Sequence, residues 1–360
     1  MNTESKMRVL VTGHDGYIGC VLVPMLQARG HEVVGLDSGL FVGCEFDDLP
    51  FECETIRADV RDINPEHMQG IDAVIHLAGI SNDPLGDLNS ECTYDINHRA
   101  SVRVAKVART AGVQRFLQSS SCSLYGAHGD DLIDESAEFK PVTPYGESKV
   151  LVERDVAPMA SDTFSPVFLR NATAYGLSAR LRGDLVVNNL TGYAVTKGEV
   201  FLKSDGTPWR PLVHIRDISL AFIAAMEAPR KLIHNKAFNV GRTAENFRMS
   251  EVAEIVRSVV PDSVVTYAEG AGPDKRCYRV DCRKIEDELP GYEPCWTVRQ
   301  GVEELYAAYK AHGLTVDELE SSRYMRIKHV QGLQAGGRLD GDLRWKVGSP
   351  ETLAEPAVGS

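Results

Sequence analysis

The first half of the chain alternates short apolar runs with longer amphipathic segments. Residues 8–12 form a β-branched apolar run that meets Gly13, and residues 20–29 have the spacing of a helix that ends at Gly30. Repeated alternation of strand and helix is typical of a doubly wound parallel sheet, so we expect an α/β fold. Further strand-like runs lie at residues 32–36, 56–58, 73–77 and 116–118, and the longest helix between them is predicted at residues 90–110.

The composition is that of an ordinary globular protein. The 360 residues are 43% hydrophobic and 25% charged, which is enough for one large or two modest domains. A net charge of −12 without a lysine or arginine cluster argues against nucleic-acid binding. No apolar run approaches the ~18 residues that cross a bilayer, and the N-terminus lacks the apolar core of a secretory signal, so we expect a cytoplasmic protein without a membrane partner. The eight cysteines include no C-x-x-C pair, and we expect no metal site.

A glycine-rich turn joins the first predicted strand to the first predicted helix. Gly13, Gly16 and Gly19 form the pattern G-x-x-G-x-x-G. Such a turn lets a diphosphate approach the backbone at the positive N-terminal end of a helix. Tyr17 and Ile18 lie inside the turn and belong to the same candidate dinucleotide site. The alternative is a glycine-rich turn without a ligand.

Two aspartates follow later strands. Asp37 ends the second strand, eighteen residues after Gly19, where a carboxylate accepts hydrogen bonds from a ribose diol and repels a 2′-phosphate. No arginine follows directly in residues 38–40, so the pattern favours NAD over NADP. Asp59, followed by Val60, either meets the adenine or simply caps the end of a strand.

Tyr145 and Lys149 stand four residues apart in a predicted helix and therefore share one face. A nearby cation favours the phenolate and lowers the tyrosine pKa from about 10 toward the neutral range. The pair predicts a proton-transfer site. The alternative is a partly buried tyrosine beside a solvated lysine on an ordinary amphipathic helix. A serine cluster at residues 119–121 precedes the pair.

Taken together, these motifs resemble the extended short-chain dehydrogenase/reductase family, and within it the nucleotide-sugar epimerases and dehydratases. The resemblance covers roughly residues 7 to 310 and rests on the order and spacing of the motifs. They are the glycine turn, Asp37, Asp59-Val60, His76-Leu77-Ala78-Gly79, Asn97, Ser119-Ser120-Ser121, Tyr145-x-x-x-Lys149, Arg170-x-x-Thr173-x-x-Gly176, Asn188-Asn189-Leu190 and residues 210–217.

The resemblance implies a cofactor, NAD, and a catalytic triad. Tyr145 would remove a proton from a sugar hydroxyl while hydride passes to the nicotinamide, giving a 4-keto sugar. Lys149 would lower the tyrosine pKa and hold the nicotinamide ribose. Ser121 would hydrogen-bond the sugar oxygen, unless it is only a satisfied loop hydroxyl. The resemblance adds Leu77, Ala78, Gly79, Asn97 and Ser119 to the cofactor site.

The resemblance also implies a nucleotide-diphosphate sugar as substrate. Asn189 and Arg210 would contact the diphosphate, because an arginine fork bonds two phosphate oxygens at once. Thr173 stands where the epimerases commonly have asparagine. The segment around Asp274 lacks the arginine that is usual in the family, and Arg276 is its nearest substitute. The nucleotide base and the sugar remain open.

The residues after Ser121 bear on the reaction that follows oxidation. Sugar 4,6-dehydratases carry an Asp-Glu pair there, whereas this chain has Cys122 and Ser123. This departure disfavours 4,6-dehydration and favours epimerisation at C4 through a transient 4-keto sugar. Decarboxylation, 4-keto reduction or dehydration by a member of the same family are the alternatives. A catalytically idle NAD-binding regulatory protein is the alternative from a different class.

The resemblance implies a Rossmann-type sheet domain and a smaller C-terminal α/β substrate domain. The NAD-binding domain is predicted at residues 7–170 with returning segments near 211–241, and the substrate domain at 171–210 and 242–313. A helix is expected at 251–260 after a Ser250 cap, and another at 298–312. An extension of unknown role follows at 314–347, with a helical pattern over 316–334, and a flexible tail at 348–360. The family pairs helices near 92–110 and 146–160 across a dimer, so we expect a homodimer.

Overall fold

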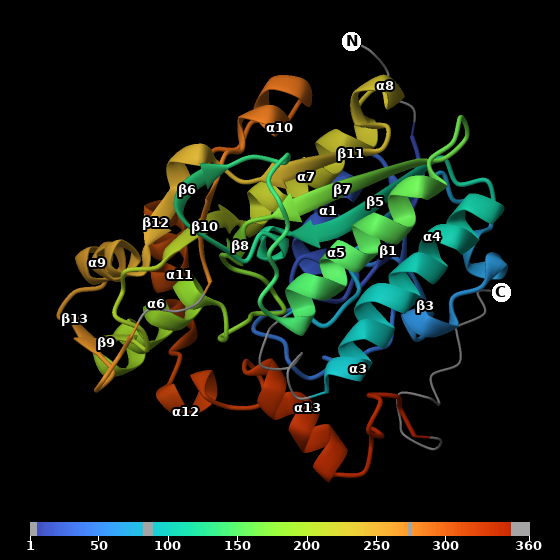
Figure 1. Cartoon of the computed structure of the whole chain (residues 1–360). Helices are drawn as coiled ribbons and strands as arrows, with labels where there is room; N and C mark the ends of the chain where they lie inside the picture. The colour runs from blue at the N-terminus through green and yellow to red at the C-terminus, as the bar shows by residue number, and fades with distance from the viewer. Residues whose placement is uncertain (1–5, 82–88, 273–275, 347–360) are drawn as a thin grey trace.

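The core of the protein is a seven-stranded parallel sheet in the order β11-β7-β5-β4-β1-β2-β3 (Figure 1). The computed structural model describes residues 6–81, 89–272 and 276–346. Every neighbouring pair in this sheet is parallel, so the predicted doubly wound α/β fold is confirmed. The strands are β1 (Arg8–Thr12), β2 (Glu32–Asp37), β3 (Glu54–Arg57), β4 (Ala73–His76), β5 (Arg115–Ser121), β7 (Ser165–Asn171) and β11 (Lys236–Val240).

Helices cover both faces of this sheet. The helices α1 (Gly19–Ala28) and α7 (Ile215–Glu227) pack on one face, and α4 (Ala100–Thr110) and α5 (Pro144–Val156) pack on the other. Side chains alternate along a strand, so Val9 and Val11 join the α1 side while Leu10 joins the α4 side. Burial on both faces explains why β1 is apolar throughout instead of alternating with polar residues.

Two helices carry the residues that border the site. Thr143 caps α5 by accepting a hydrogen bond from the Gly146 amide at 3.1 Å, and Pro144 occupies the first helical position. The cap fixes Tyr145 at the start of the helix. The helix predicted at 90–110 forms as α3 (Ser90–Thr93), a π-helical segment (Tyr94–Arg99) and α4. Wide turns of this kind often occur at functional sites.

A smaller layer, built mostly by the second half of the chain, has its own apolar core. Its helices are α6 (Val186–Lys197), α9 (Met249–Val259) and α11 (Val298–His312), whereas the short helices α8 (Arg230–Ile233) and α10 (Arg283–Glu288) pack on the core of the large sheet. The strands are β8 (Thr173–Tyr175), β10 (Trp209–His214) and β12 (Asn246–Arg248) in one sheet, β9 (Glu199–Leu202) with β13 (Val264–Tyr267), and β6 (Ala127–Ile133) with β14 (Cys277–Val280). The helices α6, α9 and α11 share one apolar cluster.

Some details differ from the predictions. Helix α9 begins at Met249, because the Glu251 carboxylate accepts a hydrogen bond from the Arg248 amide at 2.7 Å, so the predicted Ser250 cap is wrong. Helix α11 has the predicted bounds. Residues 211–214 lie in the three-stranded sheet, and the chain rejoins the central sheet only at β11. The division into two domains and the dimer through α4 and α5 stay predictions.

The C-terminal extension forms two short helices instead of the continuous helical pattern predicted over 316–334. They are α12 (Val316–Leu319) and α13 (Arg326–Ala335). In Figure 1 both lie along the lower edge of the molecule, α12 below α6 and α13 below α5. The predicted tail at 348–360 lies outside the described residues. Within the described ranges, no helix combines the length and apolar composition that crossing a bilayer requires.

Candidate active site

A cavity of about 750 Å³ brings the predicted site residues together. Its volume is within the range of about 300–1,000 Å³ that is usual for ligand sites. Asn97 does not line it, and Asp274 lies outside the described residues. The predicted residues that line it are Gly13, Gly16, Tyr17, Ile18, Gly19, Asp37, Asp59, Val60, Leu77, Ala78, Gly79, Ser119, Ser121, Tyr145, Lys149, Thr173, Asn189, Arg210 and Arg276.

The glycine turn is packed so tightly that side chains are excluded. Gly13 has φ +75°, and a Cβ there would lie 2.8 Å from the Ala78 nitrogen. A Cβ at Gly19 would lie 2.2 Å from the His14 carbonyl oxygen. Helix α1 starts at Gly19, on the cavity wall. A bare backbone at a helix N-terminus fits the diphosphate of a dinucleotide.

Asp37 and Asp59 line the same end of the cavity. Asp37 accepts a hydrogen bond from the Gly39 amide at 2.8 Å, and burial raises its carboxyl pKa. Arg57 of β3 comes within 4.0 Å of Asp37 but does not line the cavity. Asp59 accepts hydrogen bonds from the Arg61 amide at 2.8 Å and from its guanidinium at 2.6 Å. Asp59 is therefore a cap that also faces the cavity, and its contact with adenine stays a prediction.

His76 and Asn97 support the cavity from behind. Ser101 donates its hydroxyl proton to the Asn97 carbonyl at 2.6 Å, so the His76 Nε2–H must donate to the Ser101 oxygen at 2.8 Å. His76 Nδ1 then accepts from the Thr12 hydroxyl at 2.6 Å. Burial lowers the pKa of His76 to about 3, which keeps the ring neutral. The Asn97 side chain bonds the backbone N–H and C=O of Ile80 at 2.7 and 2.8 Å, so it holds the loop after β4 in place.

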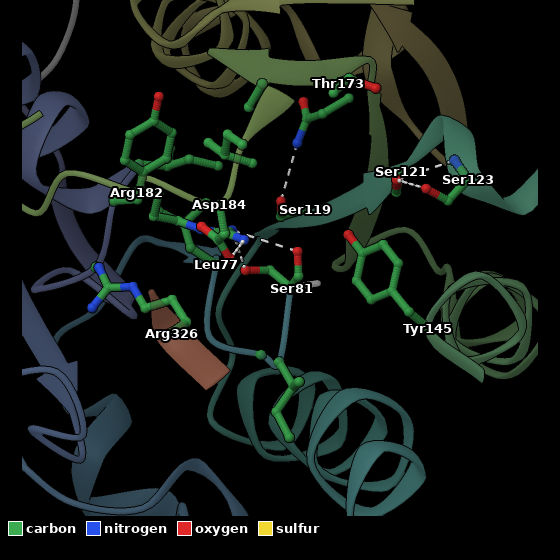
Figure 2. Close-up of a pocket in the computed structure, with 18 of the residues that line it drawn as sticks. Leu77, Ser81, Ser119, Ser121, Ser123, Tyr145, Thr173, Arg182, Asp184 and Arg326 are labelled. Carbon is green, nitrogen blue, oxygen red and sulfur yellow. Dashed lines mark hydrogen bonds and ion pairs between the residues drawn. The ribbon is translucent and has the colours of Figure 1, made fainter. Parts of the chain in front are cut away.

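The catalytic candidates meet at the end of β5. The Lys149 Nζ donates to the Ser119 carbonyl at 2.8 Å and lies 5.6 Å from the centre of the Tyr145 ring. Burial lowers the pKa of Lys149 to about 8, which leaves the group cationic at neutral pH. Ser121 accepts from the Ser123 amide at 3.1 Å and bonds the Ser123 hydroxyl at 3.1 Å. Figure 2 shows the Tyr145 hydroxyl pointing toward the part of β5 that carries Ser119 and Ser121.

The position directly after Ser121 faces away from the cavity. Cys122 is 1% exposed, and its thiol donates to the Arg170 carbonyl at 3.1 Å. Ser123 does line the cavity. Of the two positions that carry Asp and Glu in the dehydratases, one is therefore buried in the core here and the other carries a neutral hydroxyl. Among the residues that the structure describes, no group of three or more His, Cys, Asp or Glu side chains could hold a metal ion.

The predicted substrate contacts come from four separate segments. Thr173 lies on β8, Arg210 on β10 and Asn189 on α6, and Arg276 precedes β14. The Asn189 amide donates to the Gly183 carbonyl at 2.7 Å. The Arg210 guanidinium donates a hydrogen bond to the backbone carbonyl of Arg276, and both residues line the cavity. Arginine suits a diphosphate, because one guanidinium bonds two phosphate oxygens at once.

The cavity is also lined by residues that the sequence patterns did not single out. Arg182 makes two parallel hydrogen bonds to Asp184, both at 2.9 Å, and a third to the Ser81 hydroxyl at 2.8 Å. Arg326 reaches the cavity from α13, and Leu343 from the segment after it. No motif marks Arg326 or Leu343, because both are remote in sequence from the other residues that line the cavity.

The chain is similar in sequence to known enzymes of one family. The family model described as NAD dependent epimerase/dehydratase family matches residues 9–241. The chain is 26% identical over 334 residues to UDP-glucuronic acid decarboxylase 1 of Arabidopsis thaliana, covering 88% of this chain and 72% of that protein. It is 30% identical over 312 residues to UDP-glucose 4-epimerase of Neisseria meningitidis serogroup C, covering 76% of this chain and 89% of that protein.

Solved structures share the fold. MoeE5 in complex with UDP-glucuronic acid and NAD superposes with a TM-score of 0.74 at 26% identity, covering 84% of this chain and 99% of that one. UDP-glucose 4-epimerase from Thermotoga maritima with UDP-glucose gives a TM-score of 0.75 at 22% identity, covering 86% of this chain and 100% of that one. The relatives therefore include both epimerases and a decarboxylase.

Proposed function

The chain belongs to the NAD dependent epimerase/dehydratase family, and we propose that it is a nucleotide-sugar 4-epimerase that works through a transient 4-keto sugar. The observation that carries the proposal is the meeting of Ser121, Tyr145 and Lys149 in the cavity that the glycine turn also lines. Proton transfer and dinucleotide binding then occur in one site.

Each catalytic residue has a role that its surroundings support. The Tyr145 phenolate removes the proton from the sugar 4-hydroxyl, and the nearby Lys149 cation favours that phenolate. Ser121 bonds the same sugar oxygen while charge develops on it. NAD, when bound, would supply the acceptor for the C4 hydride and the donor for its return. The sugar would turn in the cavity between the two transfers, so that hydride reaches the opposite face and the configuration at C4 inverts.

The substrate diphosphate would be held at the other side of the cavity. Arg210 and Arg276 both line the cavity, and the Arg210 guanidinium donates to the backbone carbonyl of Arg276. Asn189 adds an amide, and Thr173 a hydroxyl. These donors suit a nucleotide diphosphate, and they leave the sugar to extend toward Tyr145.

The residues after Ser121 favour epimerisation over dehydration. Elimination of water needs an additional acid and base, and Cys122 and Ser123 supply no carboxylate beside Ser121.

The adenosine end of the cavity bears on the choice of cofactor. Asp37 and Asp59 line the cavity beside the glycine turn, where the adenosine of NAD would bind. The carboxylate of Asp37 disfavours NADPH, which argues against a reductase that consumes its cofactor.

Decarboxylation of a uronic acid is the second candidate. The Arabidopsis relative is a UDP-glucuronic acid decarboxylase, and the MoeE5 structure contains UDP-glucuronic acid. A substrate carboxylate would need a cation in the cavity. Arg182 lines the cavity, but it is paired with Asp184 through two hydrogen bonds, so it offers no unpaired charge to such a carboxylate.

A panel of nucleotide sugars tests the proposal. Purified protein is incubated with each sugar, and products are read by mass spectrometry and NMR. Unchanged mass with inverted C4 supports the epimerase. Loss of carbon dioxide selects the decarboxylase, loss of water a dehydratase, and gain of two hydrogens a reductase. Binding of NAD without turnover of any sugar would support the catalytically idle alternative.

A further inference from the structure

The C-terminal extension closes the end of the cavity beside the glycine turn. Its residues pack on the loops that follow β2 and β3. The Trp345 indole donates to the Ser38 carbonyl at 2.8 Å, and the His329 Nε2 bonds the Leu40 carbonyl at 2.8 Å. Leu343 and Arg326 of the extension line the cavity together with Asp37 and Asp59. The family model ends at residue 241, so this wall lies outside the matched region.

The wall is firmly held in place. Leu339 and Leu343 form a buried apolar cluster with Val330 and Leu333 of α13 and with Ile80 beside the cavity. The guanidinium of Arg61, next to Asp59, donates to the Asp342 carbonyl at 2.7 Å and to the Leu343 carbonyl at 3.4 Å. Apolar packing and polar contacts thus fix the extension against the loops that border the adenosine end of the cavity.

Arg326 is the unusual residue of this wall. It is 4% exposed and its guanidinium stacks on Phe41, with 3.9 Å between the guanidinium carbon and the ring centre. Its Nη2 donates to the Arg180 carbonyl at 3.3 Å. Its Nη1 is buried and has no hydrogen-bond partner among the described residues. A buried cationic donor without a partner is costly, which points to a ligand that would complete it.

The neighbouring arginines already have partners. Arg180 is paired with Asp15 at 2.8 Å and also with Glu45. Arg182 is paired with Asp184. Within residues 6–81, 89–272 and 276–346, Arg326 has no such carboxylate partner. Burial lowers its pKa to about 10, so the group stays cationic at neutral pH, and an unmatched positive charge lies in the cavity wall.

We propose that Arg326 binds the diphosphate of NAD and that the C-terminal extension encloses the adenosine half of the cofactor. The inference rests on the proposed function in one respect, that NAD occupies this cavity. The extension would then retain NAD in the site between turnovers, since an epimerase regenerates its cofactor within each turnover.

The position of Arg326 favours the cofactor diphosphate over that of the substrate. Arg326 stacks on the loop after β2 and bonds the carbonyl of Arg180, whose guanidinium bonds Asp15 in the glycine turn. Figure 2 shows Arg326 and Tyr145 on opposite sides of the cavity. The substrate end already has its own pair, Arg210 and Arg276.

Ligand fragments and matched variants test the inference on the full-length chain. NAD-free protein is titrated calorimetrically with NAD, ADP-ribose and adenosine. Arg326→Gln should weaken NAD and ADP-ribose about tenfold or more, since a charge-assisted hydrogen bond is lost, and leave adenosine unchanged. Arg326→Lys should retain part of the affinity. Lys328→Gln removes the same charge from the exposed face of α13 and should change nothing.

Three results would overturn the inference. They are equal NAD affinity in Arg326→Gln and wild type, an equal loss for adenosine, and, when UDP is titrated as a fourth ligand, a loss of affinity for UDP alone. Thermal melts add a readout that a purely structural arginine would not give. The variant without NAD should melt at or above the wild-type temperature and show a smaller rise with NAD. A lower melting temperature with unchanged NAD affinity would mean a structural role only.

The same titrations separate this inference from the proposed function. If wild type binds NAD and Arg326→Gln binds it equally well, only the inference fails. If wild type binds NAD through Arg326 but turns over no nucleotide sugar, only the proposed function fails. If wild type does not bind NAD, both fail.

Discussion

The buried charge of Lys149 should lower the free energy of unfolding of the protein. The side chain is 6% exposed, and burial lowers its pKa from 10.5 to about 8. At about 1.4 kcal/mol for each pH unit, this difference corresponds to a cost of about 3 kcal/mol for holding the charge in the folded chain at neutral pH. Replacing the lysine by methionine removes that cost and keeps a chain of similar length.

Part of this gain is offset by a lost hydrogen bond. Lys149 donates to the Ser119 carbonyl at 2.8 Å, and a hydrogen bond from a charged donor contributes about 1.5–3 kcal/mol. The Ser119 carbonyl keeps a second donor, the Gln118 side chain at 3.2 Å, so the variant leaves no bare acceptor. We expect Lys149→Met to be about 1 kcal/mol more stable than wild type near pH 7, and to have no epimerase activity.

The pH dependence distinguishes this explanation from simple repacking. Below a pH of about 8 the folded and the unfolded wild-type chains both hold the Lys149 proton, and the folded chain bears the full cost. Between about 8 and 10.5 only the unfolded chain holds it, so wild-type stability rises with pH. The stability advantage of Lys149→Met should therefore shrink above a pH of about 8 and reverse at higher pH.

Urea unfolding of NAD-free protein, at pH values from about 7 to about 9.5, measures both effects. Lys106→Met is the matched control, because Lys106 is exposed on α4 and its change should not alter stability in this pH-dependent way. If Lys149→Met is less stable than wild type near neutral pH and the difference does not vary with pH, the Lys149 charge does not carry the proposed cost in the folded protein.

Two further substitutions test the supports of the site. Gly13→Ala places a Cβ 2.8 Å from the Ala78 nitrogen at φ +75°, so it should lower the melting temperature and abolish NAD binding in calorimetry; unchanged affinity would exclude the glycine turn as the diphosphate site. Glu153→Gln removes the buried partner that Arg170 bonds at 2.7 Å, and should cost about 3 kcal/mol in urea unfolding. Glu153 raises the pKa of Lys149, so Lys149 should lose its proton at a lower pH in the variant. The alkaline limb of the pH–activity profile should therefore shift to lower pH, and an unchanged profile would contradict this coupling.

The cofactor half of the site can be predicted from the sequence because each contact comes from a short contiguous motif. The glycine turn requires glycines for reasons local to one strand and one helix, and Asp37 follows from the end of the next strand. Tyr145 and Lys149 share a helix whose start is set by Thr143 and Pro144. Local rules suffice where a strand, a turn and a helix are consecutive.

Other parts of the site depend on contacts between distant segments. Asn97 belongs to a motif, but the structure uses it to hold the Ile80 backbone across a π-helical segment that no spacing rule indicates. Arg326 meets Phe41 and Arg180 only after the extension has folded back over the sheet edge. Ser250 fits a capping pattern, yet the Glu251 carboxylate starts the helix earlier. In each case a tertiary contact decides what the local pattern leaves open.

Transfer of a C4 deuterium label tests whether Tyr145 starts a hydride transfer that is reversed at the same carbon. The nucleotide sugar that reacts in the panel is prepared with deuterium at C4 and incubated with wild type, Tyr145→Phe and, as a control, Tyr94→Phe, whose hydroxyl bonds Glu147 outside the cavity. Wild type and Tyr94→Phe should give a C4-inverted product that keeps its deuterium, and folded, NAD-binding Tyr145→Phe should give almost none. Loss of the label to solvent, or normal turnover by Tyr145→Phe, would contradict this mechanism.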